Sequence, residues 1–190
     1  MQADYTVELG ADDPALEMPW SAADGGCRYL NLKASPELVL NLPEATKYPE
    51  LSAFLTRINA PGFPLETAKC DAWFTRELSP EDEIFGASCK FVSYVDLLFT
   101  EEEGRASFEQ HESFTQELCR LLERAPEMAA CAEFVVRHCH YHAEGGSDSV
   151  TGFCVTAYIS GYGDSEEEAA KRWMIALKLL QHAVVQIARH

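Results

Sequence analysis

Three histidines occupy every second position in the stretch RHCHYH, which covers residues 137–142. Imidazole nitrogens are common zinc ligands, and residues two apart on a strand lie ~6.6 Å apart at the backbone, so two such side chains can reach one ion. We expect at most two of the three to share a site, because His138 and His142 lie twice as far apart. The zinc set that this pattern predicts is His138 or His140, Cys154 and one carboxylate, Asp71 or Asp96.

The same histidines have a second interpretation as polar residues on the outer side of a strand, hydrogen-bonded to neighbours or water. No Cys-x-x-Cys occurs among the seven cysteines, so no zinc ribbon is indicated. A neighbouring imidazole can also favour a thiolate, so His140 and Cys154 could form a nucleophilic pair. The main prediction is therefore no cofactor, and the alternative is zinc.

Two periodicities define the elements that must position these residues. Apolar residues at helical spacing predict three helices, at residues 48–60, 107–126 and 164–188. Alternating runs rich in aromatic and β-branched residues predict two hairpins, 66–78 with 86–99 and 129–142 with 153–163. The stretch CRYLNL at 27–32 predicts a further short strand.

The order of these elements predicts a single α+β domain over residues 1–190, in which an antiparallel sheet of two β-hairpins carries helices on one face. Its two successive ββα units suggest an internal duplication, although convergent patterning of amphipathic hairpins would look the same. The predicted divisions are an N-terminal arm on the surface (1–45), a helix and connection (46–64), a first ββα unit (65–126) and a second ββα unit (127–190).

Cross-strand pairing predicts which residues leave the core. Lys69 opposite Asp96 in the first hairpin, and His140 opposite Cys154 in the second, each give one apolar face and one mixed face. Exposed aromatic residues are unfavourable unless something covers them, so we expect the N-terminal segment, a protein or a small molecule to lie there. The predicted binding face consists of Trp73, Tyr94, Phe134, Tyr158, Lys69, Asp71 and Asp96.

The charge narrows the classes of partner. Thirty-one acidic against 15 basic residues give a formal net charge of −16, which repels phosphate backbones and anionic membrane surfaces. We therefore predict no nucleic-acid and no membrane partner. The N-terminal stretch has no secretory-signal pattern, no apolar run reaches membrane-spanning length, and the cysteines suggest no disulfide framework, so we expect a cytoplasmic protein.

The sequence also resembles type III secretion chaperones in the order of its elements. The resemblance rests on LSAFLTRINA leading into a hairpin, and on GFCVTAYISGYGDSEEEAAKRWMIALKLL as the closing strand and helix. The chain departs from that pattern because one strand is missing from the first sheet segment and the first 45 residues are extra. The resemblance implies a homodimer that binds an unfolded segment of a client protein and catalyses no reaction.

The sequence therefore predicts a non-enzymatic, acidic, chaperone- or adaptor-like protein that binds a protein partner, or itself as a homodimer, through an aromatic sheet face. The alternative is a small metal- or thiol-dependent enzyme or ligand-binding protein with its site around His138, His140 and Cys154. An acidic mimic of nucleic acid would also agree with the charge, but the carboxylates are spread along the chain.

Overall fold

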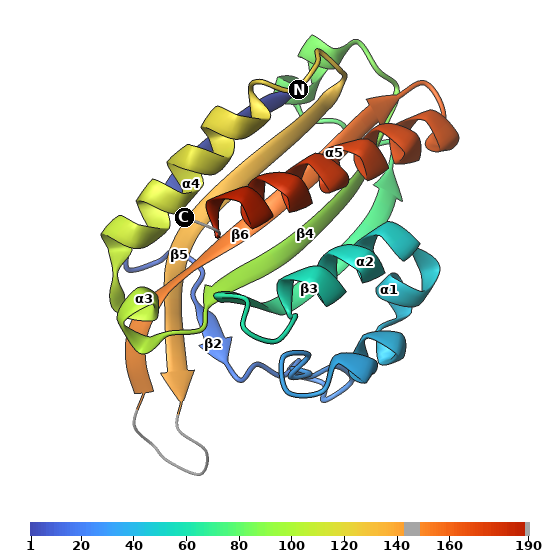
Figure 1. The fold of residues 1–190 in the computed structure, drawn as a ribbon. Coiled ribbons are helices and arrows are strands. Elements are labelled where there is room, and N and C mark those ends of the chain that lie inside the picture. Colours follow the sequence, from blue (N-terminus) through green and yellow to red (C-terminus); the bar gives the residue numbers. More distant parts are fainter. Residues whose placement is uncertain (143–148, 189–190) are drawn as a thin grey trace.

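A six-stranded mixed sheet forms the centre of the part of the chain that the computed structural model describes, residues 1–142 and 149–188. The strand order is β1-β5-β6-β4-β3, and β2 pairs with a later part of β5. Helices cover one face, as expected for the α+β class (Figure 1). The strands are β1 (Gln2–Glu8), β2 (Leu16–Met18), β3 (Leu65–Thr75), β4 (Cys89–Phe99), β5 (Ala130–His142) and β6 (Ser149–Gly163).

Three helices lie side by side across that face, with α5 between α2 and α4 (Figure 1). Their positions agree with the helical periodicity of the sequence. Two begin at serine caps, because the Ser107 and Ser165 side chains accept hydrogen bonds from backbone N–H groups three residues on. The helical elements are η1 (Pro36–Asn41), α1 (Pro43–Lys47), α2 (Pro49–Ile58), η2 (Pro80–Phe85), α3 (Glu102–Ala106), α4 (Phe108–Leu122) and α5 (Glu166–Ile187).

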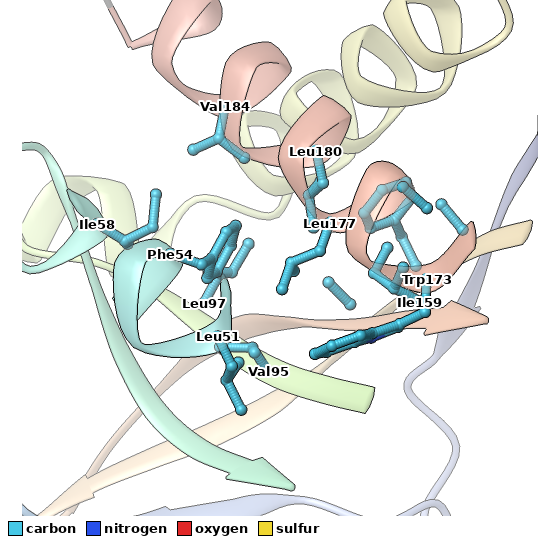
Figure 2. Close-up of a cluster of buried hydrophobic side chains, with 14 of the residues drawn as sticks. Leu51, Phe54, Ile58, Val95, Leu97, Ile159, Trp173, Leu177, Leu180 and Val184 are labelled. Carbon is cyan, nitrogen blue, oxygen red and sulfur yellow. The ribbon is translucent and has the colours of Figure 1, made fainter. Parts of the chain in front are cut away.

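The main core lies between these helices and the sheet, as Figure 2 shows for its α2 and α5 side. Trp173 of α5 is almost fully buried, and its indole N–H donates to Ser93 Oγ at 2.8 Å. Helix α5 approaches β6 closely at Gly161, where a Cβ atom would lie 2.2 Å from the Trp173 backbone nitrogen. The helices therefore fix one side of the sheet by close packing.

The N-terminal residues correct the first expectation about the sheet. An arm on the surface and a purely antiparallel sheet were expected, but β1 and β2 both pair with β5 in parallel. The predicted strand at 27–32 is absent: within the described residues this region has one isolated bridge, Ser21 with Arg28. The internal duplication stays a prediction.

The predicted register is correct from Cys70 to Phe74 in the β3–β4 pair and wrong for the β5–β6 pair. Cys70 pairs with Val95 and Phe74 with Phe91, as the alternating pattern of β3 and β4 predicted. In the second pair, however, Cys154 lies opposite Arg137, whereas His140 had been expected there. The offset is an odd number of residues, so it exchanges the two faces of β5. This exchange moves several predicted site residues to the other side of the sheet.

Candidate functional site

The face of the sheet opposite α2, α4 and α5, here called the open face, is covered by the chain at one end (Figure 1). Residues 16–29 place Leu16, Met18, Trp20 and Tyr29 against Leu98, Cys139 and Cys154. In this second apolar cluster Trp20 and Tyr29 are partly buried and the other side chains are buried. The N-terminal segment therefore covers one end of the open face, beside the predicted aromatic residues Trp73, Tyr94 and Tyr158 and not over them.

The chain also covers the opposite end of the open face. The ring of Phe85 in η2 stacks on Tyr162 with centroids 4.0 Å apart, and the Tyr162 hydroxyl donates to Asp82 at 2.6 Å. Lys90 adds an ion pair to the same carboxylate at 2.7 Å. These contacts place η2 over the end of the sheet where β6 finishes and β4 begins.

Between these two covers lies the aromatic row, defined as Trp73, Tyr94 and Tyr158 on three adjacent strands. Tyr94 lies directly opposite Tyr158 in the β4–β6 register, with ring centroids 5.9 Å apart. Trp73 meets Tyr94 edge to face at 6.4 Å and keeps 37% of its surface exposed. The row is therefore continuous across the middle of the open face, as the sequence predicted for these three residues.

Carboxylates extend the line of the aromatic row on both sides. Asp71 lies opposite Tyr94 on β3, Glu133 lies opposite Tyr158 on β5, and Asp4 lies opposite Glu133 on β1. All three are exposed. The sequence predicted Asp71 on this face but not Asp4 and Glu133, because the first residues were expected outside the sheet and the two faces of β5 were exchanged.

Asp96 occupies the next position toward the N-terminal cover, and it is buried. Thr156 Oγ1 donates to its carboxylate at 2.6 Å. Burial raises the pKa of Asp96, although the Thr156 hydrogen bond and the charges of Lys69 and Arg137 act in the opposite direction. Burial likewise raises the pKa of Tyr94 to about 12, and the Asp96 and Asp71 carboxylates add to this shift.

Lys69 does not form the expected cross-strand pair with Asp96. A register shift between Thr67 and Cys70 removes Lys69 from the regular β3–β4 pairing. Its ammonium group lies 5.1 Å from the centre of the Trp20 ring instead, where it joins the edge of the N-terminal cover. Lys69 therefore belongs to the border of the N-terminal cover.

Phe134 is a correction to the predicted binding face. It is fully buried in the main core on the helix side, because the true β5 register turns residues 134, 136 and 138 toward the helices. The neighbours that face the open side are Val135 and Arg137. Apolar residues stand at both parities here, so alternation could not distinguish the two faces.

The predicted zinc residues are also separated. His138 lies opposite Phe153 and stacks on its ring at 5.4 Å on the helix side, whereas Cys154 points to the open face and is buried. A hydrogen bond from Cys139 and burial raise the pKa of the Cys154 thiol well above its usual value, which disfavours a thiolate. His140 contacts Oγ1 of Thr151, the residue opposite it on β6, at 3.2 Å. This contact is what an ordinary polar residue on a strand would make. A shared site or a His140–Cys154 pair would need both residues on one face.

Two hollows adjoin the carboxylate end of the row. A groove of about 410 Å³ runs between β1 and Tyr158, with Asp4, Glu133 and Arg137 among its lining residues. A larger depression of about 780 Å³ separates η2 from β1 and the start of β5. Within residues 1–142 and 149–188, no three His, Cys, Asp or Glu side chains are grouped as a metal site. That the protein has no cofactor, with zinc as the alternative, stays a prediction.

No protein-family model matches this chain, and no curated protein or solved structure matches it significantly. None of the helices in the described part of the chain is long and apolar enough to cross a membrane.

Proposed function

We propose that this protein binds another polypeptide, without catalysis, through the aromatic row on the open face. The observation that carries the proposal is the middle of that face, where Trp73 is exposed and Tyr94 and Tyr158 are partly exposed. The chain covers its open face at both ends, with residues 16–29 and with η2, and leaves Trp73, Tyr94 and Tyr158 between them.

The residue types in the row support protein binding. Tryptophan and tyrosine are enriched among the residues that contribute most to protein–protein affinity, because they bury a large area and lose little side-chain entropy. Trp73 and Tyr94 lie on strands, whose packing against the helices holds them in place before a partner arrives. Client binding is also what the resemblance to type III secretion chaperones implies. A homodimer and a cytoplasmic location stay predictions.

The test is a peptide array that samples residue types evenly, probed with the purified protein and with Trp73→Ala. We expect a subset of peptides to bind the wild type and to lose most of the signal with Trp73→Ala. The matched control is Ile175→Ala, because Ile175 is an exposed apolar residue of α5, 44% exposed, beside a groove on the helix side of the sheet.

The array distinguishes the two surfaces. Loss of peptide binding with Ile175→Ala and not with Trp73→Ala would move the site to the helix side and contradict the proposal. A wild-type protein that binds no peptide on the array would contradict polypeptide binding itself.

A further inference from the structure

If the proposed function holds, the carboxylates in line with the aromatic row determine which polypeptides bind. Asp71 and Glu133 are exposed, and among the described residues neither forms an ion pair with a lysine or arginine. Although the residue is exposed, partial burial of its carboxyl group raises the pKa of Glu133; the Lys90 charge opposes this shift, and the nearby charges of Asp82 and Asp4 add to it. A cation placed at Glu133 would reduce this repulsion between like charges.

The basic residues near the row are already engaged with other groups. Arg137 forms an ion pair with Glu8 at 3.0 Å, and Lys90 pairs with Asp82. Lys69 lies over the Trp20 ring. The middle of the open face therefore presents a negative charge that these basic side chains leave available to a partner.

The position of Arg137 shows that a cation can lie against an aromatic ring of the row. Its guanidinium carbon lies 6.0 Å from the centre of the Tyr158 ring, a cation–π distance, while its Nε donates to Glu8. The molecule thus already places a cation between an aromatic ring and a carboxylate on this face. Asp71 beside Tyr94 and Trp73 offers the same combination of groups without an arginine of its own.

The sheet sets the spacing that a partner must match. Asp71 lies on β3 and Glu133 on β5, with β4 and β6 between them, so three inter-strand steps of ~4.8 Å separate the two carboxylates by roughly 14 Å. An extended peptide places residues i and i+4 about 13 Å apart. Two cations at that spacing would reach both carboxylates across the two tyrosines.

We propose that the aromatic row binds a cationic segment of another protein, in which two arginine or lysine side chains four residues apart pair with Asp71 and Glu133 while the residues between them pack on Tyr94 and Tyr158. A second copy of this chain fits the face poorly. Contact between two such faces would oppose the same carboxylates, and each chain carries a net charge of −16.

The experiment is calorimetric titration with the blocked peptide Gly-Arg-Ser-Ala-Ser-Arg-Gly and with the same peptide carrying citrulline in place of both arginines. Citrulline keeps the shape of arginine but removes the charge. We expect the arginine peptide to bind about tenfold more tightly or better, and to weaken as NaCl is raised because salt screens exposed charges. The double variant Asp71→Asn/Glu133→Gln should lose that preference.

The matched control removes two carboxylates from α4, on the far side of the sheet, as Glu109→Gln/Glu112→Gln. This control should bind the arginine peptide as the wild type does, which separates local pairing from the effect of overall charge. Three results would each contradict the proposal of a cationic partner. These are equal affinity for the two peptides, an unchanged affinity in Asp71→Asn/Glu133→Gln, and no binding of the arginine peptide by the wild type. Polypeptide binding itself would still stand on the array and on its sensitivity to Trp73→Ala.

Discussion

The two sides of the sheet differ in what their aromatic residues contact. On the helix side Trp173 is 1% exposed, packs on Phe91 and Tyr48, and satisfies its N–H with Ser93. On the open side Trp73 keeps 37% of its surface exposed and touches Tyr94 at one edge. One sheet thus stabilises the fold on one side and leaves an aromatic side chain partly exposed on the other.

The other residues on the two sides of the sheet also differ in what they do. Ser93 and Gly161 on the helix side allow α5 to approach the strands closely. On the open side, carboxylates and tyrosines alternate with the core positions of the same strands. Stability and binding should therefore respond to different substitutions.

Trp173→Ala should have the largest effect on stability. Removing a buried aromatic side chain leaves a cavity and costs about 3–5 kcal/mol, and it also leaves Ser93 without its indole partner. Urea denaturation followed by circular dichroism measures the loss. Trp73→Ala is the control within the comparison and should cost less than about 1 kcal/mol, since its side chain is partly exposed. Equal losses in the two variants would contradict the division between the two sides.

Gly161→Ala should have the next largest effect. The added methyl group would lie 2.2 Å from the Trp173 nitrogen and 2.4 Å from the Ala169 carbonyl oxygen, both of them backbone atoms of α5 that cannot rotate away. Overpacking of this kind costs about 1–3 kcal/mol. The neighbouring Ser160→Ala, on the open side of the same strand, is the control for thermal unfolding. An unchanged melting temperature in Gly161→Ala would show that α5 can shift freely on β6.

Asp96→Asn should have a smaller effect that depends on pH. The unfolded chain ionises this carboxyl as the pH rises past 3.8, whereas burial raises the pKa of Asp96 in the folded state, so the native protein loses stability from pH 3.8 up to that raised pKa. Asparagine cannot ionise, and its carbonyl oxygen can still accept from Thr156.

We therefore expect Asp96→Asn to unfold at a higher urea concentration than the wild type at pH 7, with a difference that shrinks as the pH falls toward 4. The exposed carboxylate Asp71 of the adjacent strand supplies the control variant Asp71→Asn. A variant less stable than the wild type at pH 7 would mean that the ionised Asp96 carboxylate stabilises the fold.

Local patterns in the sequence predicted the parts of the fold that depend on near neighbours. The serine cap at Ser107 and the apolar stripe that follows it predicted α4, and the alternation of apolar residues from Cys70 to Phe74 predicted the register with β4. In both cases one face is apolar and the other is not, so only one arrangement buries the apolar side chains.

The patterns failed where both faces of a strand are covered. In β5, Phe134 and Val136 face the helices while Val135 and Cys139 face the open side, so no alternation marks the core face. Because of that ambiguity, the prediction exchanged the two faces of β5 and placed the histidines on the same surface as Cys154. Of the predicted binding face, Trp73, Tyr94, Tyr158 and Asp71 come together in the fold. Glu133 was not predicted, because its position on this face follows only from the β5 register.

The pairing of β1 with β5 also sets an order of assembly. Gln2 lies beside Cys131, so β1 lacks the strand with which it pairs until the chain has been made as far as β5. Contacts of such long sequence separation cost the most loop entropy and are expected to form late. During synthesis β1 would remain an unpaired strand, and the charges of Asp4 and Glu8 would then protect it from pairing with other chains. The acidic residues of β1 would thus act before the fold is complete.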